Sequence, residues 1–345
     1  MKITRPDLAN VEPHVLQYID ALERELARFA RLDDDKEEVE FSELKVNEPP
    51  TTLNVITFTA SRIAKRTPRH LYSRQRRGGM GVFDLDTPDD DPPRFIIVAD
   101  ESRNLILFTN LARAFRLPVN QITLGEVRDK GQSIASRFQL HEGEHLVTAL
   151  TDQPMGGVAL VSSLGMVRFL RHHVFGEYMR PGTPMFDPKK FGNLVAACRT
   201  PGDSDLFIAT NHGKAIRFSE KLVPPQGGPG IRLENGDSVA AITSVYPDSG
   251  VFLADSLGRG TIRLMNSFSP NKGAGGGGKN AMNTDQLIAA VTVNANEDIF
   301  MISRLSKMIR FTAEEVPAKE GNVQGVNCMG LRGDEVISIA VSVNT

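Results

Sequence analysis

The chain has 345 residues, 40% of them apolar and 24% charged, and a formal net charge of -2, which is the composition of a folded protein rather than a disordered one. No stretch approaches the roughly 18 consecutive apolar residues that span a bilayer, and the first residues lack the apolar core of a signal peptide. Cys198 and Cys328 have no CxxC spacing, so we expect two reduced core thiols. These features predict a cytoplasmic protein of one or two domains without a membrane segment.

Residues 1 to 48 are predicted to be separate from the rest of the chain. Five apolar residues recur at spacings of four and three, as on one face of an amphipathic helix: Val15, Ile19, Leu22, Leu26 and Phe29. Such a helix either docks on the main domain or forms the seam of a weak homodimer, and both readings stay open. The acidic residues 33 to 40 and then Glu48-Pro49-Pro50 indicate a solvated linker. We therefore expect the main domain to comprise residues 49 to 345.

The net charge hides an uneven distribution. Residues 1 to 48 hold 7 Lys and Arg against 13 Asp and Glu, whereas residues 49 to 345 hold 33 against 29. Residues 51 to 81 contain no acid but seven cations, which are Arg62, Lys65, Arg66, Arg69, Arg74, Arg76 and Arg77. Five acids follow between Asp84 and Asp91. One part of the main domain is thus a candidate surface for a polyanion.

From Thr51 onward, short β-rich runs broken by Gly, Pro and Asn form an internal repeat. The segments SSLGMVRFL, TNHGKAIRFS, SLGRGTIRLM and RLSKMIRFT place Arg168, Arg217, Arg263 and Arg310 at separations of 49, 46 and 47 residues. Two weaker copies, TASRIAKRT and TNLARAFRL, place Lys65 and Phe115 in the same slot, at separations of 50 and 53 residues. The repeat therefore has six units.

Each unit is predicted to hold about four short strands. It opens with an apolar strand such as FIIVAD or GVFLADS, turns into the Arg-bearing strand, and closes with a buried strand such as LENGDSVAAITSV or DQLIAAVTV. One small sheet cannot bury both of its faces alone and has to stack on neighbouring sheets. The expected fold is all-β, a six-bladed propeller of four-stranded blades with a short N-terminal helix.

The first unit carries a distinctive heptapeptide, Gln75-Arg76-Arg77-Gly78-Gly79-Met80-Gly81, between its hairpin and the acidic loop. Two adjacent guanidinium groups offer bidentate phosphate contacts, and glycines let a phosphate approach backbone N–H groups. The alternative is a glycine-rich surface turn with two solvated arginines. We call residues 75 to 81 the box.

The box resembles the heptapeptide box of DNA gyrase A, which has lysine in place of Met80 and also lies in the first blade. The resemblance extends from about residue 53 to residue 343 and includes the count of six units. It implies a β-pinwheel, like the DNA gyrase A C-terminal domain, that wraps duplex DNA around its outer rim. Lys65, Arg168, Arg217, Arg263 and Arg310 either place one cation per blade on that rim or pair with neighbouring acids as structural groups, and Met80 leaves the strength of wrapping open.

The function that the resemblance implies is wrapping of double-stranded DNA without sequence preference, as an accessory to the control of DNA topology in the nucleoid. Two alternatives stay open: a detached C-terminal half of a split gyrase A or topoisomerase IV polypeptide that joins the other subunits, and a protein-interaction propeller that has lost DNA binding. The candidate DNA-binding residues are Gln75, Arg76, Arg77, Gly78, Gly79 and Gly81 of the box, Arg62, Lys65, Arg66, Arg69 and Arg74 around it, and Arg168, Arg217, Arg263 and Arg310.

No catalytic site is expected. The nucleophile of a type II topoisomerase is a tyrosine preceded by arginine, whereas Tyr18, Tyr72, Tyr178 and Tyr246 follow Gln, Leu, Glu and Val. The glycine-rich residues 273 to 280 approach a phosphate-binding P-loop but lack its final Ser or Thr and a following helix. The histidines lack metal-ligand spacing, so we expect neither a metal nor a nucleotide cofactor.

Overall fold

The computed structural model describes Val15, Ile19, residues 48–88 and residues 90–342. The chain divides into two compact units, Met1–Lys45 and Val46–Thr345. Val15 and Ile19 are helical, and the rest of the amphipathic segment lies outside the described residues, so its predicted packing stays a prediction.

The second unit is built from six hairpins that follow from the predicted repeat. The first strand of each hairpin is almost entirely buried on both faces, because a blade of a propeller has another blade on each side. The first strands are β1 Leu53–Thr59, β5 Asn104–Thr109, β9 Gly157–Ser162, β13 Asp205–Thr210, β17 Gly250–Asp255 and β21 Asp298–Ser303. The second strands are β2 Ile63–Pro68, β6 Arg113–Pro118, β10 Met166–Arg171, β14 Lys214–Ser219, β18 Arg259–Leu264 and β22 Lys307–Thr312.

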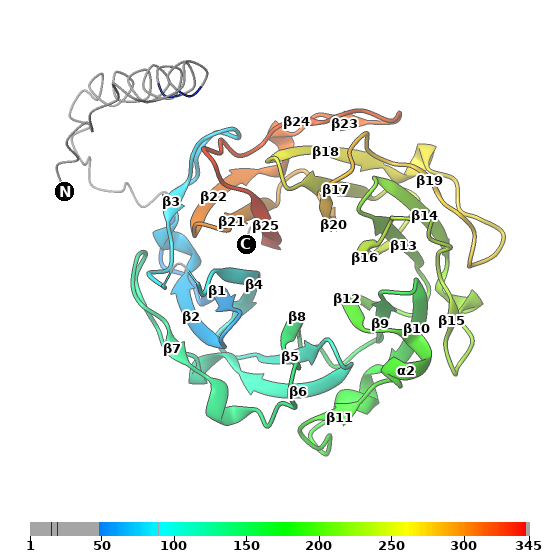
Figure 1. Ribbon diagram of the computed structural model, residues 1–345, viewed down its shortest axis with the longest axis horizontal. Helices are drawn as coiled ribbons and strands as arrows, with labels where there is room; N and C mark the ends of the chain where they lie inside the picture. The colour runs from blue at the N-terminus through cyan, green and yellow to red at the C-terminus, as the bar shows by residue number, and fades with distance from the viewer. Residues whose placement is uncertain (1–14, 16–18, 20–47, 89, 343–345) are drawn as a thin grey trace. The chain divides into compact units, whose positions relative to one another are not determined.

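The closing strand of each repeat pairs with its first strand and forms the inner edge of the blade (Figure 1). These inner strands are β4 Pro93–Asp100, β8 Leu146–Thr151, β12 Leu194–Thr200, β16 Val239–Val245, β20 Leu287–Val293 and β25 Val336–Ser342. A short 3-10 turn follows each second strand, at η1 Arg69–Leu71, η2 Val119–Gln121, η4 His172–Phe175, η5 Glu220–Leu222, η6 Met265–Ser267 and η7 Ala313–Glu315. The connections add η3 Ala135–Arg137 and the short helix α2 Pro188–Phe191.

The outermost strand of every blade comes from the next repeat along the chain, a feature that the sequence pattern did not predict. These outer strands are β7 Gln132–Ser133 on β2, β11 Thr183–Pro184 on β6, β15 Gly228–Pro229 on β10, β19 Lys279–Asn280 on β14, and β23 Ala318–Lys319 and β24 Val326–Asn327 on β18. The first repeat supplies β3 Val82–Phe83, which pairs with β22 of the last blade. The six blades, numbered by their first strands, thus form a closed ring (Figure 1). The predicted all-β, six-bladed architecture of four-stranded blades is confirmed.

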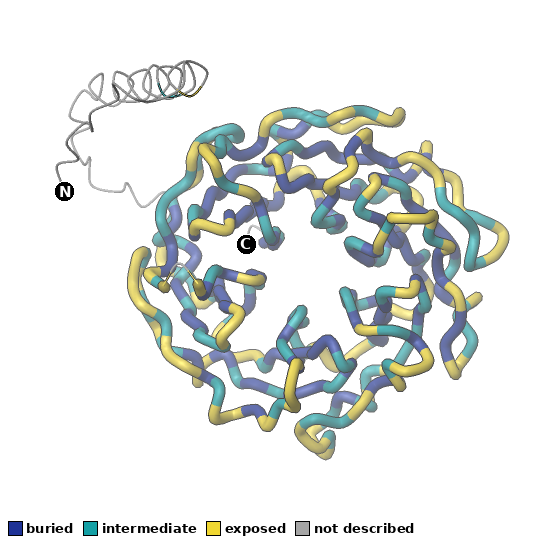
Figure 2. Tube along the Cα trace, viewed as in Figure 1, coloured by how far each residue is buried: buried dark blue, intermediate teal, exposed yellow. Residues whose placement is uncertain are grey.

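The hydrophobic core lies between the blades rather than in one central mass. Each of six clusters joins apolar residues of two successive repeats, such as Ile56 and Phe58 of the first with Leu105 and Phe115 of the second. Figure 2 shows buried residues along the strands and exposed residues at the loops of the outer edge. Stability therefore comes from stacking neighbouring blades, as in other repeat proteins.

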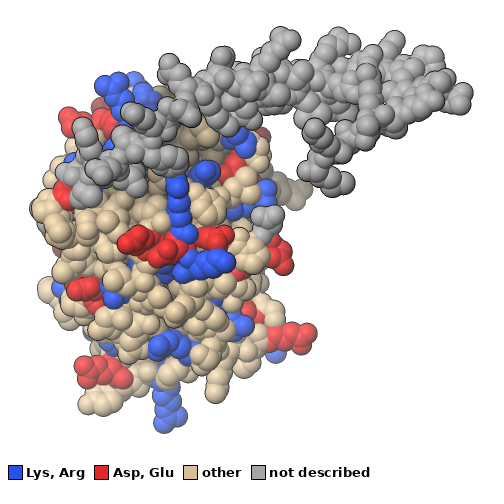
Figure 3. Space-filling model, turned by 90° about the vertical axis from the view of Figure 1, so that its left-hand side faces the viewer, with Lys and Arg blue, Asp and Glu red and all other residues tan. Residues whose placement is uncertain are grey.

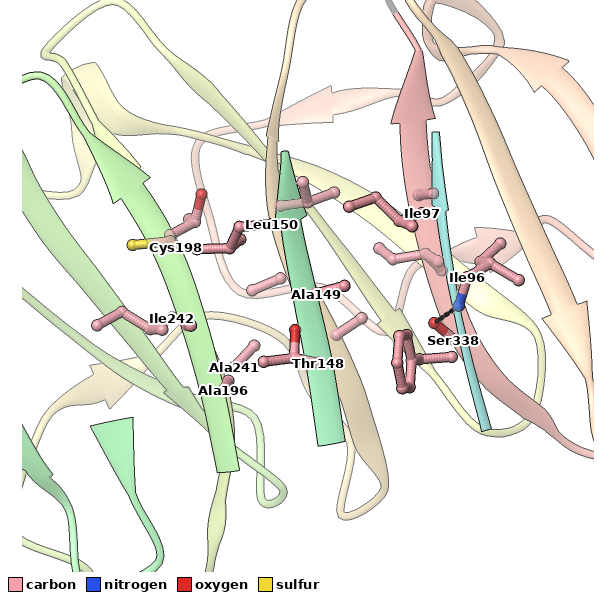
Figure 4. A pocket seen from close by; sticks show the side chains of 18 of the residues that line it. Ile96, Ile97, Thr148, Ala149, Leu150, Ala196, Cys198, Ala241, Ile242 and Ser338 are labelled. Atoms are coloured by element: carbon pink, nitrogen blue, oxygen red, sulfur yellow. Dashed lines mark hydrogen bonds between the residues drawn. The ribbon is translucent and has the colours of Figure 1, made fainter. Parts of the chain in front are cut away.

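The inner strands surround a central cavity of about 630 Å³. Its wall carries small and apolar side chains, including Ala149, Ala196 and Ile242, and Ser338 accepts a hydrogen bond from the backbone of Ile96 (Figure 4). Arg199 at the end of β12 donates to three backbone carbonyls, at 3.2, 2.9 and 2.7 Å. Because these contacts occupy the Arg199 guanidinium, we interpret the lining of the cavity as part of the scaffold rather than as a ligand site.

Gly81 lies at the point where the ring closes. Its φ is +71°, and a Cβ there would lie 2.5 Å from the carbonyl oxygen of Met308 on β22. Gly143 has a similar φ of +70°, but a Cβ there would meet nothing within 4 Å. Gly81 therefore differs from Gly143 in combining the left-handed conformation with a backbone in contact.

We expect Gly81→Ala to lower the free energy of unfolding by at least about 1 kcal/mol more than Gly143→Ala, because both variants strain φ but only the first also forces β3 away from β22. Denaturant unfolding of the two variants beside the parent measures the difference. Equal losses would show that the close approach at Gly81 does not matter for closure.

Candidate nucleic-acid interface

The box joins the first repeat to the last two blades. The backbone N–H of Gln75 donates to the carbonyl of Arg310 at 2.8 Å, that of Gly78 to Cys328 at 2.7 Å, and Gly330 donates to Gly79 at 2.9 Å. The strand β3 follows immediately and completes blade 6. The box is therefore part of the clasp that closes the ring.

The two arginines of the box have different environments. Arg77 is half-buried, and its guanidinium donates to the carbonyls of Glu315 at 2.8 Å and Asn327 at 3.0 Å, while its backbone N–H donates to the Glu315 carboxylate at 2.9 Å. Arg76 is exposed, and no partner of its guanidinium is found among the described residues. The geometry thus makes Arg77 a structural group and leaves Arg76 available to a ligand.

The glycines of the box fit both readings of the motif. Gly78 has a φ of +84°, and a Cβ on Gly79 would lie 2.8 Å from the side-chain oxygen of Gln75. The left-handed conformation at Gly78 therefore favours glycine for the turn itself, whereas the flexible Gln75 side chain can move away from a Cβ on Gly79. Met80 is 46% exposed at the edge of this turn.

The cations that repeat on the second strands are mostly buried. Lys65, Arg217 and Arg310 are 1%, 2% and 2% exposed and form ion pairs with Asp84 at 2.9 Å, Asp205 at 2.8 Å and Asp298 at 2.7 Å. Such side chains have no free surface for a phosphate. Of the two alternatives left open by the sequence, pairing with neighbouring acids is the one observed for these three residues.

Arg168 and Arg263 occupy the same slot but lack the acid. Arg168 donates to the carbonyl of Met185 at 2.6 Å, and Arg263 lies 5.6 Å from the ring centre of Phe268. The Nε atoms of both have no hydrogen-bond partner among the described residues. The strands paired with them begin with Gly157 and Gly250, where the corresponding strands of Arg217 and Arg310 begin with Asp205 and Asp298. Burial lowers the pKa of Arg263, with Glu320 acting in the opposite direction.

The seam between the first and last blades holds a network of ion pairs. Arg69 is buried and contacts Glu48 at 3.0 Å and the hydroxyl of Ser342 at 2.7 Å, and Arg74 contacts Asp298 at 2.9 Å. Arg310 contacts both Asp298 and Glu48. Glu48, which the sequence assigned to a solvated linker, is thus tied to the ring.

Glu48 is held in its charged form by this network. Partial burial acts to raise its pKa, but hydrogen bonds and charge from Arg310 and then Arg69 outweigh it and hold the pKa of Glu48 below its ordinary value of 4.5. Its carboxylate therefore stabilises the folded state above that ordinary value, and the contribution is lost as pH falls through the lowered folded-state pKa.

The remaining candidate residues lie apart from the box. Arg62 occupies the hairpin turn between β1 and β2 with a φ of +71°. Arg66 donates to the carbonyl of Ile122 at 2.9 Å and pairs with Glu101 at 3.2 Å. The cationic segment of residues 51 to 81 is thus distributed over the turn, the core and the seam, and does not form one surface around Arg76.

A second set of cations lies on the loops that lead to the outer strands, and sequence reasoning had found only Arg76 among them. We call these rim loops; each ends in a glycine shortly before its outer strand, and they are residues 75–81, 125–131, 176–182, 221–227, 272–278 and 319–325. Each contains at least one exposed cation: Arg76, Arg128 and Lys130, Arg180, Lys221, Lys272, and Lys319. The glycine that recurs every 45 to 51 residues, as Gly81, Gly131, Gly182, Gly227, Gly278 and Gly325, was the signal that would have found them.

Acidic groups lie among these cations. Asp84 and Asp91 are buried and accept hydrogen bonds from Thr57 and Thr59 at 2.7 and 2.8 Å, so they are structural. Asp86 is half-exposed and lies 3.6 Å from Lys130. Figure 3, which faces the side of the ring with β3 and β7, shows basic and acidic groups interspersed on the described surface. The rim is a mixed surface with cations at regular positions rather than a continuous basic patch.

Other chemistry is not supported by the described part of the chain. Within residues 48–88 and 90–342, with Val15 and Ile19, no group of three His, Cys, Asp or Glu could hold a metal ion. The same residues include no helix long and apolar enough to cross a membrane. Burial raises the pKa of Cys328 to about 12 and that of Cys198 well above its ordinary value, so both thiols are unreactive core groups.

Comparison with known proteins gives one family. The DNA gyrase C-terminal domain, a beta-propeller family, matches residues 53–91, 103–151, 204–245 and 297–344. The DNA gyrase A polypeptide of Ureaplasma parvum serovar 3 is 28% identical over 299 residues, which cover 83% of this chain and 36% of that protein. The DNA gyrase A polypeptide of Staphylococcus epidermidis is 25% identical over 304 residues, covering 84% and 34%. The chain thus spans about a third of the length of these relatives.

Solved structures agree on the fold. A DNA gyrase A C-terminal domain superposes with a TM-score of 0.75 at 20% identity, covering 84% of this chain and 100% of that one. The C-terminal domain of DNA topoisomerase IV superposes with a TM-score of 0.60 at 20% identity, covering 84% and 93%.

We expect Glu48→Gln to lower the free energy of unfolding by about 1 kcal/mol at neutral pH, because the neutral amide loses the charge-assisted contacts to Arg310 and Arg69. The gap between variant and parent should close as the pH falls through the lowered folded-state pKa of Glu48, which lies below its ordinary value of 4.5. Denaturant unfolding across a pH series measures this difference in the free energy of unfolding. Glu101→Gln is the control, since the half-exposed ion pair of Glu101 with Arg66 contributes little to stability. A gap that stays constant in acid would refute the role given to the Glu48 charge.

Proposed function

Because the chain belongs to the family of DNA gyrase C-terminal domain beta-propellers, we propose that it binds duplex DNA around the outer rim of the ring, without sequence preference, as an accessory to the control of DNA topology. The observation that carries this proposal is the exposed cation on every rim loop. A duplex following the rim would meet positive charge at each blade in turn.

Contacts of this kind act on the phosphate backbone. Lys and Arg side chains on turns hold phosphates and so fix the position of a duplex, but they carry no information on its bases. Neutralising phosphates releases condensed counterions, so affinity should fall steeply with salt. Non-specific binding with strong salt dependence is therefore the expected behaviour.

The box contributes to this interface through Arg76. It is exposed at the clasp between the first and last repeats, next to Gly78 and Gly79. The backbone N–H groups of these two glycines donate to Cys328 and Arg76, so the phosphate contact proposed for the box rests on the Arg76 side chain. Arg77 supports the same turn through its contacts to the last repeat. Met80 takes the place of a lysine in the related motif, which leaves one cation fewer on this loop.

Two other functions remain as alternatives. As a C-terminal half that joins gyrase or topoisomerase IV subunits, the ring would deliver DNA to a cleavage module on another chain. As a protein-interaction propeller, it would rely on the mixed charge of its rim, where Asp86 faces Lys130. Copurification with the other subunits tests the first, and an absence of DNA binding in the parent protein favours the second.

We expect Arg76→Ala to weaken binding to long duplex DNA of any sequence and to lower the salt slope by about 1, the value for one lost phosphate contact. The matched control is Arg94→Ala, which removes another exposed arginine from β4, the inner strand of its blade, at the opposite edge of the sheet from the outer strand. Mobility shifts at a series of salt concentrations measure both. An unchanged slope in the Arg76 variant would leave the box as a structural turn only.

The protein alone should neither cut nor rejoin DNA and should not hydrolyse ATP. The expectation rests on the four tyrosines, none of which follows an arginine, and on residues 273–280, which run into the outer strand β19 rather than into a helix. Incubation of highly purified protein with plasmid and magnesium, followed by gel analysis, tests it. A nicked or linear product that scales with protein concentration would contradict it.

A further inference from the structure

Tyr178 is the most exposed large apolar side chain in the described part of the chain, with 97% of its surface accessible. It lies on the rim loop of residues 176–182, which leads to β11 at the outer edge of blade 2 (Figure 1). A ring of this size presents a large rigid contact surface at little entropic cost when it meets a partner. Its full exposure is therefore a feature to be explained.

The loop that carries Tyr178 is built to present it. Met179 donates to the carbonyl of Gly176 at 3.0 Å, which closes a turn with Tyr178 at its third position, and Thr183 closes a second turn on Arg180 at 3.1 Å. At its base, Gly182 donates to Ala114 of β6 at 2.8 Å. Just before the loop, Phe175 is fully buried and packs on Phe108 with ring centres 5.8 Å apart. The tyrosine thus sits at the tip of an anchored loop.

The segment around this tip carries more basic than acidic residues, although the exposed Glu177 directly precedes Tyr178. Arg180 is exposed two residues later on the same loop. Residues 171 to 190 hold four Lys and Arg against two Asp and Glu, and Arg171, Lys189 and Lys190 are exposed as well. An exposed aromatic ring within a cationic segment matches the chemistry of a nucleic acid backbone, which is anionic at its phosphates and apolar at its sugars.

The same pairing of an apolar and a cationic side chain recurs on neighbouring blades. Met80, Leu124 and Leu222 are 46%, 57% and 42% exposed and lie on or beside the rim loops that carry Arg76, Lys130 and Lys221. With Tyr178, they mark the outer edges of blades 6, 1, 2 and 3, which are consecutive in the ring (Figure 1). The rim loops of residues 272–278 and 319–325, on blades 4 and 5, carry none of the exposed large apolar side chains.

We propose that these four side chains form a nonionic arc of the rim, centred on Tyr178, that packs against the sugar edges of duplex DNA while the neighbouring cations hold its phosphates. The inference rests on the proposed function, because it assumes that a duplex lies on the rim. It goes beyond that function by dividing the rim into two arcs. Blades 6, 1, 2 and 3 make apolar and ionic contacts with the duplex, and blades 4 and 5 make ionic contacts alone.

Salt separates the two kinds of contact. A lost ionic contact changes the slope of affinity against salt, because one counterion fewer is released. A lost apolar contact lowers affinity by the same factor at every salt concentration, since no counterion is involved. Tyr178→Ala should therefore shift the whole salt titration without changing its slope, whereas Arg180→Ala should flatten it by about 1.

The experiment is a salt titration of binding to long duplex DNA by the full chain and its variants. We expect Tyr178→Ala to weaken binding by about fivefold at each salt concentration, and Tyr178→Phe, which keeps the ring, to stay within about twofold of the parent. The matched control is Leu257→Ala, which removes an apolar side chain that is 56% exposed in the hairpin turn between β17 and β18, outside the rim loops. Identical unfolding transitions of the variants would confirm that the fold is intact.

The outcomes distinguish the inference from the function beneath it. If the parent shows no salt-dependent binding to duplex DNA, the proposed function itself fails. If the parent binds and Arg180→Ala flattens the slope, but Tyr178→Ala equals the parent at every salt concentration, the function stands and the nonionic arc is refuted. Two further results would overturn the nonionic arc. One is a change in the slope of affinity against salt for Tyr178→Ala, and the other is a loss of affinity in this variant for single-stranded DNA but not for duplex DNA.

Discussion

The pairing of each second strand with a short strand from the following repeat is the constraint on which the rest of the ring depends. Without it, every blade would end in an open row of backbone N–H and C=O groups at the periphery, where it would template aggregation. Only two residues of pairing are needed per blade, as Val82–Phe83 provides on β22. The chain has to travel outward to make this pairing, and the path it takes creates the rim loops. The surface proposed for DNA is thus a by-product of covering the sheet edges.

The same geometry separates two classes of cation that look alike in the sequence. A cation on a second strand lies between that strand and the incoming turn of the next repeat, so Arg217 and Arg310 each donate to two carbonyls of that turn. Burying such a charge is costly unless it is paired, and Asp205 and Asp298 supply the pairing. An exposed cation on a rim loop, such as Arg76 or Lys221, stays in water and carries no such cost. Arg77 is the exception on these loops, because its guanidinium donates to carbonyls of the last repeat.

Much of the fold was accessible from the sequence, and much less of the site. The period of about 47 residues and the alternation of apolar strands with turns predicted the number of blades and most of their inner three strands, because those patterns reflect local burial. One assignment was wrong: FIIVAD, expected to open a unit, belongs to β4, the inner strand of blade 1, and the next unit opens with β5. The outer strands are two residues long and lie against another repeat, so they leave no periodic signal. The roles of Lys65 and Arg310 were ambiguous for a related reason. Asp84, the partner of Lys65, lies outside its hairpin, and Glu48, one partner of Arg310, lies in a segment that the sequence assigned to a linker. The box predicted Arg76 and Arg77 equally as phosphate contacts. The neighbouring sequence does not distinguish the two, because the partners of Arg77 are Glu315 and Asn327, near the other end of the chain.

Closure between Val82–Phe83 and Lys307–Thr312 also sets an order for synthesis of the protein. The box is among the first parts of the ring to leave the ribosome, and the strand that it precedes has no partner until the last repeat has emerged. Blades 1 to 5 can assemble as the chain grows, because each needs only its immediate successor, whereas blade 6 needs β3 of the first repeat. The turn that holds Arg76 takes its shape from Arg310, Asn327 and Cys328. A nascent or truncated chain would therefore expose the sequence of the box without its conformation. The arrangement acts as a check on completeness, since a ring lacking its last repeat could not present this loop to a ligand.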